Sequence, residues 1–186
     1  DAACVIECDD GYANCDGDLE NGCEAEDPGE PRTPRPLRPM LGHFTGALAG
    51  AEVTGALTPR FTWRASASGD CSVRTQLQVD DSCAIDSFKK CKFASPEVDE
   101  LVDDDEFTLK DELPVSNTVP VGSRYYWRIR SCDLSERCSD WSDVRYLEVG
   151  RDRQDVTGDG YPDVVLVDVV SDKHSIFPGG PSFGVD

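Results

Sequence analysis

The sequence predicts an all-β protein, in which a sandwich follows a small disulfide-rich module and precedes a β-hairpin with a calcium-binding loop. Five segments alternate apolar with polar residues, which is the period of half-buried strands. Turn-rich stretches separate these segments at intervals typical of a sandwich. No segment has a clear 3.6-residue apolar period, and the charged stretch 96–107 is expected to be a solvated loop with at most one helical turn. The five predicted strands cover residues 59–65, 73–79, 106–113, 123–131 and 144–150.

The composition indicates an extracellular protein. Nine cysteines in 186 residues lack both the paired C-x-x-C spacing of zinc sites and the C-x-x-C-H motif of c-type haem. Disulfides are therefore expected, and they place the protein in an oxidising compartment, secreted or on the cell surface. The net charge of -19 disfavours nucleic acid and favours divalent cations. No apolar run is long enough to span a membrane.

Residues 1–27 form an acidic, cysteine-rich module with too few apolar residues for a core. Two disulfides are expected to replace that core. Its four cysteines are Cys4, Cys8, Cys15 and Cys23. The alternating residues Asn14, Asp16, Asp18 and Glu20 have the spacing of ion ligands, which predicts a weaker second calcium site. The alternative is that these acids are only solvated.

Residues 28–40 are rich in proline and are expected to be an extended linker. Residues 41–150 then contain the sandwich. Gly122, Tyr125 and Ile129 resemble the F-strand pattern of fibronectin type III domains, although Val121 stands where that family usually has proline. The resemblance implies that Tyr125 packs inside and that its hydroxyl bonds back to the preceding corner.

The same alternation directs Trp127, Ile129 and Ser131 into the predicted core with Tyr125, facing Phe61 and Trp63 on another strand. Ser139-Asp140-Trp141-Ser142 resembles the WS-type element of related receptor modules. The preferred interpretation of this element is a polar bulge with one aromatic cap.

Five cysteines lie in the predicted sandwich. The pairs Cys83/Cys91 and Cys132/Cys138 are close enough in sequence to close local loops. Cys71 is then free or bonded to a residue outside this chain. An exchange among Cys71, Cys132 and Cys138 stays open, because the B–C and F–G loops of this fold lie at the same end.

The sharpest motif is an acidic loop in which oxygen ligands recur at every second position. Gly158 and Gly160 permit the positive φ angles of a tight turn, and calcium prefers six to eight oxygen ligands. The predicted ligands are side chains of Asp155, Thr157, Asp159 and Asp163 and the carbonyl of Tyr161. The alternative is an acidic turn without an ion.

The acidic loop departs from an EF-hand, because its twelfth position is Leu166 and an apolar strand follows. With that strand it resembles the FG-GAP repeat of integrin-type β-propellers, which implies an incomplete propeller repeat over residues 151–186. One repeat cannot form a propeller, so the chain is expected to be the N-terminal part of a larger protein. The alternative is that the hairpin packs on the sandwich or on a neighbouring subunit.

Together, the modules resemble multi-module surface proteins of myxobacterial type. The resemblance implies a non-catalytic structural or adhesive protein that uses calcium, binds a protein or glycan partner, or assembles with itself into a fibre. The alternative is a carbohydrate- or protein-binding module of a larger secreted protein, with Trp141 as the stacking residue. No nucleophile motif accompanies His43 or His174, so no enzyme is expected.

Overall fold

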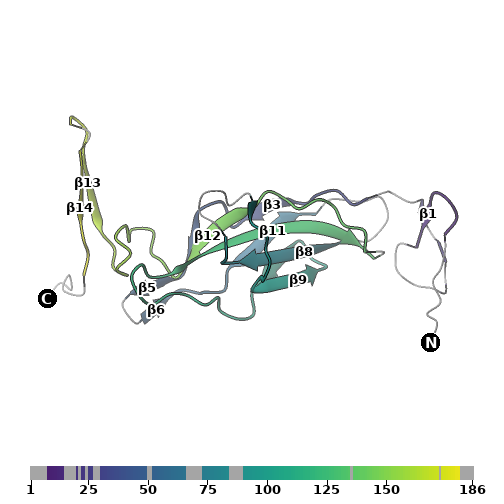
Figure 1. Ribbon diagram of the computed structural model, residues 1–186, viewed down its shortest axis with the longest axis horizontal. Helices are drawn as coiled ribbons and strands as arrows, with labels where there is room; N and C mark the ends of the chain where they lie inside the picture. Colours follow the sequence, from purple (N-terminus) through teal and green to yellow (C-terminus); the bar gives the residue numbers. More distant parts are fainter. Residues whose placement is uncertain are drawn as a thin grey trace. The chain divides into compact units, whose positions relative to one another are not determined.

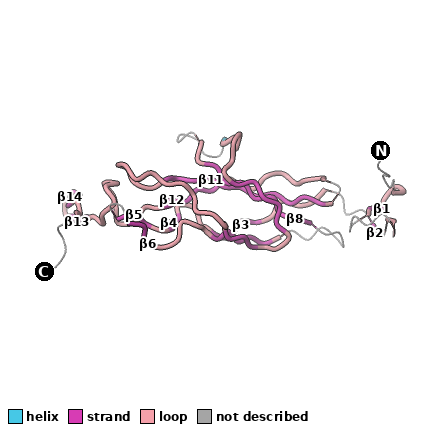
Figure 2. The backbone as a smooth tube through the Cα atoms, turned by 90° about the horizontal axis from the view of Figure 1, so that it is seen from below, coloured by secondary structure: helices cyan, strands magenta, loops and turns pink. Residues whose placement is uncertain are grey.

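The computed structural model contains β-strands and no α-helix among the residues it describes, and Figures 1 and 2 trace these strands. No described helix could therefore cross a membrane. The chain divides into two compact units, which interleave along the sequence. The described residues are 8–14, 20, 22–23, 25–26, 30–49, 52–65, 73–83, 90–134, 136–171 and 173–180.

Hydrogen bonding places the strands of the sandwich in two sheets, with the orders β10-β7-β3 and β4-β12-β11-β8-β9. Strand β11 contributes its first four residues to the second unit and the rest to the first. The strands are β3 (Arg35–Arg38), β4 (His43–Thr45), β7 (Arg60–Arg64), β8 (Val73–Asp80), β9 (Val98–Val102), β10 (Glu106–Thr108), β11 (Ser123–Asp133) and β12 (Arg145–Val149).

The first unit is built around aromatic side chains from both sheets. Phe61 and Trp127 make an edge-to-face contact with ring centroids 5.1 Å apart, a geometry that aromatic pairs favour. Trp63, Leu77 and Ile129 complete this core, and each of the five side chains is at most 1% exposed. The predicted inward face of β11 and its partners on β7 are thus confirmed.

The second unit contains β4, β12 and the first four residues of β11, together with four further strands. β4 runs parallel to β12, and β5 (Ala47–Ala49) pairs with β6 (Glu52–Thr54). β13 (Val164–Asp168) and β14 (Lys173–Phe177) form a separate two-stranded sheet. The buried apolar side chains of this unit are Leu48, Leu57, Leu109, Leu113, Val121, Tyr125, Tyr126, Leu147 and Val149.

In the N-terminal module, β1 (Tyr12–Ala13) pairs with β2 (Ala25–Glu26), and a disulfide joins Cys8 to Cys23. Within the expected second calcium site, Asn14 is half-buried and Glu20 is exposed. Cys71 of the sandwich lies outside the described residues. So do the remaining predicted residues of the N-terminal module, which are Cys4, Cys15, Asp16 and Asp18.

Several strands occur where the sequence predicted none, and β9 and β3 are two of them. β9 forms within the stretch expected to be a loop, because it pairs along its whole length with β8 while its charged side chains face solvent. β3 forms within the proline-rich linker and pairs with β7. Pro36 is tolerated there because β3 is an edge strand, which needs fewer amide donors.

The hydroxyl of Tyr125 donates a hydrogen bond to the carbonyl of Pro114, eleven residues earlier. The ring itself is 1% exposed. This is the corner that the fibronectin type III resemblance implied, and it fixes the segment that leads into β11.

Replacing Tyr125 with Phe removes this hydrogen bond and keeps the ring. We expect the free energy of unfolding to fall by about 1 kcal/mol, measured by urea denaturation followed by far-ultraviolet circular dichroism. Tyr12→Phe is the control, because Tyr12 is exposed and its replacement should change stability by less than about 0.5 kcal/mol. Equal stability of the two variants would contradict the role of the corner.

Candidate functional site

The acidic loop between the sandwich and β13 turns two of its carboxylates inward. Asp155 is 3% exposed and Asp163 is 8% exposed. The amide of Asp163 donates to the carbonyl of Gln154 at 2.9 Å, which closes the loop on itself. The two residues at its ends therefore form its interior.

The carboxylate of Asp155 accepts hydrogen bonds from two backbone amides of the turn. Gly158 N lies 2.5 Å from its Oδ1 and Gly160 N lies 3.0 Å from its Oδ2. The φ angles of these glycines are 82° and 91°, a region that other residues rarely adopt. A Cβ at Gly158 would also lie 2.9 Å from Cβ of Pro120. The glycines therefore let the chain wrap the carboxylate.

The carboxylate of Asp163 joins the start of the loop to the end of the hairpin. Its Oδ2 accepts from the amides of Val156 and Thr157 at 2.8 and 2.7 Å, and its Oδ1 accepts from Gly179 at 2.9 Å. The hydrogen bond from Gly179, followed by those from Thr157 and Val156, lowers the pKa of Asp163. The ionised carboxylate is thus the form that holds these segments together.

The three other predicted ligands lie nearer the surface. Asp159 Oδ1 accepts from the amide of Tyr161 at 2.9 Å, and Thr157 is exposed with its hydroxyl 3.3 Å from Asp163. The structure thus folds Asp155 and Asp163 into one loop interior and leaves Asp159 at its rim.

The donor set fits calcium in kind, because every ligand atom is oxygen. Each carboxylate oxygen has two lone pairs. Each oxygen of Asp155 accepts one amide and keeps a lone pair for an ion. Oδ2 of Asp163 already accepts two amides, so Asp163 would face an ion through its Oδ1. The carboxylates of Asp155, Asp159 and Asp163 do not, however, all lie within 4.8 Å of one another. Calcium binding would therefore require at least one of these carboxylates to move.

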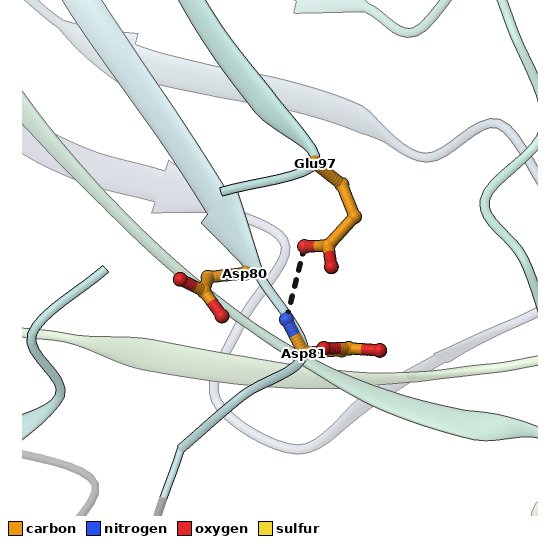
Figure 3. A group of neighbouring side chains, drawn as sticks. All are labelled: Asp80, Asp81 and Glu97. Carbon is orange, nitrogen blue, oxygen red and sulfur yellow. Dashed lines mark hydrogen bonds between the residues drawn. The ribbon is translucent and has the colours of Figure 1, made fainter. Parts of the chain in front are cut away.

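Among the described residues, a different trio meets that distance: Asp80, Asp81 and Glu97. Figure 3 shows Asp80 and Asp81 pointing to opposite sides of the chain, while the carboxylate of Glu97 accepts the amide of Asp81 at 3.0 Å. Burial, and the charges of Asp81 and Asp80, raise the pKa of Glu97. Sequence reasoning missed this group because Glu97 comes from a distant segment.

Asp80 is 1% exposed and its Oδ1 accepts from the amide of Ser82 at 2.6 Å and from the hydroxyl of the same residue. Its Oδ2 is buried without a hydrogen-bond partner. The positive charge of Arg128 interacts with this carboxylate. Arg128 therefore offsets part of the negative charge that a cation would otherwise have to balance.

A ladder of guanidinium and aromatic groups covers the outer face of the first unit. Arg128 lies 4.1 Å from the ring centroid of Trp141 and 4.2 Å from that of Phe93, and Arg130 lies 4.5 Å from that of Trp141. Such cation–π contacts are each worth about 0.5–2 kcal/mol. Burial, reinforced by the charge of Arg130, lowers the pKa of Arg128. Trp141 is half-buried beneath these groups.

The ladder continues across two more strands through amide side chains. Gln78 accepts from Arg128 at 2.7 Å, and Gln76 accepts from Arg130 at 2.8 Å. Both glutamines donate to the carboxylate of Asp99, Gln76 at 2.5 Å and Gln78 at 2.8 Å. Asp99, through the glutamines, and Asp80, through its charge, thus partly balance the two stacked cations.

Two serines hold the segment that contains Trp141 against β11 through hydrogen bonds. Ser139 Oγ accepts from the amide of Ser131, and Ser142 Oγ accepts from the amide of Ile129, both at 3.1 Å. The segment resembling the WS-type element is therefore anchored by its serines, and Trp141 projects between them onto the arginines.

Two disulfides close loops beside the ladder. Cys132–Cys138 spans the turn after β11 with a Cα–Cα distance of 4.1 Å, and Cys83–Cys91 spans 5.2 Å. Cys91 lies two residues before Phe93, so the second disulfide restrains the loop that brings this ring over Arg128. Both local pairs are those that the sequence spacing favoured.

The family model described as "Rha78A-like, N-terminal immunoglobulin domain" matches residues 50–152, more than half of the chain. The chain belongs to this family. The predicted sandwich is therefore an immunoglobulin-like domain, an architecture that fibronectin type III domains share. The match covers neither residues 1–27 nor most of 151–186, so their resemblances to surface-protein and FG-GAP repeats stay predictions.

Two solved structures are also similar to this chain, while no curated protein matches it. The α-L-rhamnosidase of Streptomyces avermitilis complexed with L-rhamnose is 19% identical with a TM-score of 0.38, covering 63% of this chain and 10% of its own. The α-L-rhamnosidase of Dictyoglumus thermophilum is 12% identical with a TM-score of 0.40, covering 79% and 17%. This chain therefore spans only a small part of either enzyme.

Acid should release the loop from Asp163. Because the pKa of Asp163 is lowered by folding, the stabilisation is fully present above its ordinary pKa of 3.8 and is lost as pH falls through the lower, folded value. We expect the amide protons of Val156, Thr157 and Gly179 to titrate together with one midpoint below pH 3.8 in NMR spectra. Asp163→Asn should abolish this common transition. Three separate midpoints, or a transition retained in the variant, would contradict the assignment.

Proposed function

We propose that this chain is a non-catalytic immunoglobulin-like module of a larger extracellular, carbohydrate-active protein. The observation that carries the proposal is the match of residues 50–152 to an N-terminal immunoglobulin domain. In this role the sandwich is a structural unit that holds or orients a neighbouring catalytic part, whose activity on α-L-rhamnosides is suggested by the names of the similar enzymes.

The described side chains support a structural role. A hollow of about 560 Å³ lies beside the hairpin, and its wall contains no carboxylate, whereas glycoside hydrolysis generally needs two flanking the bond. The buried acids Asp155 and Asp163 are held by backbone amides. His43 and His174 are both exposed.

Three disulfides within the described residues support an extracellular location, because such bonds persist in oxidising compartments. They also support a module that keeps its shape without a large core. Adhesion and assembly at a surface are compatible with this role and form part of the same proposal.

Calcium is proposed as a structural ion of the acidic loop. Asp155, Asp159 and Asp163 would hold it with Thr157 and the carbonyl of Tyr161. The ion would draw these carboxylates together and offset their mutual repulsion. It would thereby strengthen the connection between the sandwich and the hairpin. The loop already bonds to the segment before β11, because the carbonyl of Gly158 accepts a hydrogen bond from the amide of Val121 at 2.9 Å.

The alternative of a carbohydrate-binding module with Trp141 as the stacking residue is less well supported. A sugar needs an open aromatic face, and Arg128 and Arg130 both lie over this ring. We therefore favour the structural module over the binding module.

Calcium should raise the melting temperature of this chain relative to EGTA. At about 100 times its Kd, an ion that binds only the folded state stabilises by about 2.7 kcal/mol. Asp159→Ala should remove this gain, because it deletes a predicted ligand that accepts the amide of Tyr161, and it leaves the buried acids Asp155 and Asp163 in place. Differential scanning calorimetry measures both.

Asp111→Ala is the matched control, since Asp111 is an exposed aspartate outside the loop. It should keep the full calcium response. Identical melting in calcium and EGTA, or equal responses of the two variants, would remove the ion from the proposal and leave the structural module intact.

The chain should neither hydrolyse nor bind rhamnosides. We expect no release of 4-nitrophenol from 4-nitrophenyl α-L-rhamnopyranoside above buffer, and no retardation in affinity electrophoresis through rhamnose-containing polysaccharide. Release of 4-nitrophenol by the chain would contradict the non-catalytic assignment. Retardation that Trp141→Ala abolishes would replace the structural module with the binding module.

A further inference from the structure

β13 and β14 form a two-stranded hairpin (Figure 1), and its side chains are exposed on both faces. All ten strand residues are exposed. Its exposed apolar side chains are Val164, Val165, Leu166, Val167, Ile176 and Phe177. An isolated two-stranded hairpin is marginally stable in water, so a surface of this kind gains stability when another element covers it.

The outer edges of the hairpin are suited to strand addition. The five residue pairs from Val164↔Phe177 to Asp168↔Lys173 follow one another without a bulge. β13 carries no lysine or proline, the residues that commonly protect a sheet edge. Its outward backbone groups therefore present a regular row of donors and acceptors.

One face of the hairpin is also the floor of the apolar hollow. Val164, Leu166 and Phe177 line it together with Tyr161 and Pro178. Val165, Val167 and Ile176 occupy the opposite face, because side chains alternate along a strand. A strand added at the edge would extend both apolar faces at once.

We propose that this hairpin is a self-association surface, in which β13 of one copy pairs antiparallel with β14 of a second copy in the register already used within the hairpin. Apolar residues then oppose apolar residues, and Asp168 faces Lys173 of the other copy. The register is consistent with hydrogen bonding, since alternate residues of an antiparallel strand point their backbone groups to opposite edges.

Charge complementarity selects this arrangement over the two symmetric ones. Pairing β13 with itself about Leu166 would place Val164 opposite Asp168. Pairing β14 with itself about Ser175 would place Phe177 opposite Lys173. Only the β13–β14 pairing places opposite charges and apolar side chains opposite one another. Because it joins two different strands, it is a head-to-tail contact, which adds copies in an open chain and does not close into a dimer.

The net charge of -19 opposes association of identical copies. Because salt screens this repulsion, association should be stronger in about 0.5 M than in about 0.02 M NaCl. The proposal deepens the assembly that the proposed function includes. Neither catalysis nor sugar binding enters it, so its failure would leave the structural module intact.

Sedimentation velocity of the whole chain over about 1–500 μM tests the surface. In the higher salt, the average mass should rise steadily above the 20.3 kDa of one copy. Val165→Lys/Val167→Lys should remain a single copy. The matched control Val169→Lys/Val170→Lys adds the same charge to exposed tip residues outside the strands and should still associate.

A wild-type mass that stays at one copy, or that stops at two, would overturn the open strand addition. So would equal behaviour of the two double variants. Circular dichroism checks that each variant keeps its sandwich.

Mixing two charge variants tests the register separately. Asp168→Lys and Lys173→Asp each place like charges opposite one another, so each alone should associate less than the wild type. An equimolar mixture restores opposite charges at every contact between copies, though not within either hairpin. Recovery of association on mixing is expected, and a mixture no heavier than its components would refute the register.

Discussion

The strict alternation of side chains along β11 is the constraint on which the rest of the structure depends. One face supplies Tyr125, Trp127 and Ile129 to the apolar interior, which is stabilised by the contact of Trp127 with Phe61. The same backbone must then carry Arg128 and Arg130 outward. Because burying unpaired guanidinium groups is costly, the outer face needs the ring of Trp141 and the glutamines of β8 as partners. The apolar core and the arginine ladder thus both follow from the alternation of side chains along β11.

Local pattern was sufficient to predict the strands that contribute most of the core, and pairing between distant segments was not. β7, β8, β11 and β12 have an apolar side every second residue, which a single strand displays by itself. β9 has no such signature, because Leu101 and its charged neighbours face solvent and its stability comes from β8. β3 was hidden by Pro36, whose meaning depends on whether a strand is central or at an edge.

The candidate sites divide in the same way. Asp155 and Asp163 lie eight residues apart, so their spacing and the intervening glycines predicted a loop that turns its acids inward. The sequence could not show that backbone amides already occupy those carboxylates. The sequence also could not predict the ladder of arginines and rings. Its rings Phe93 and Trp141 are 48 residues apart in sequence, and each contacts Arg128. Sites built by sheet topology leave little trace in sequence spacing.

The three tryptophans of this chain, Trp63, Trp127 and Trp141, all belong to the first compact unit, whereas four of its five tyrosines belong to the second. Tryptophan emission excited at the red edge of the absorption band therefore reports on one unit alone. The two compact units carry distinct optical labels supplied by the natural sequence. Whether they melt together or in succession can thus be followed without adding a dye.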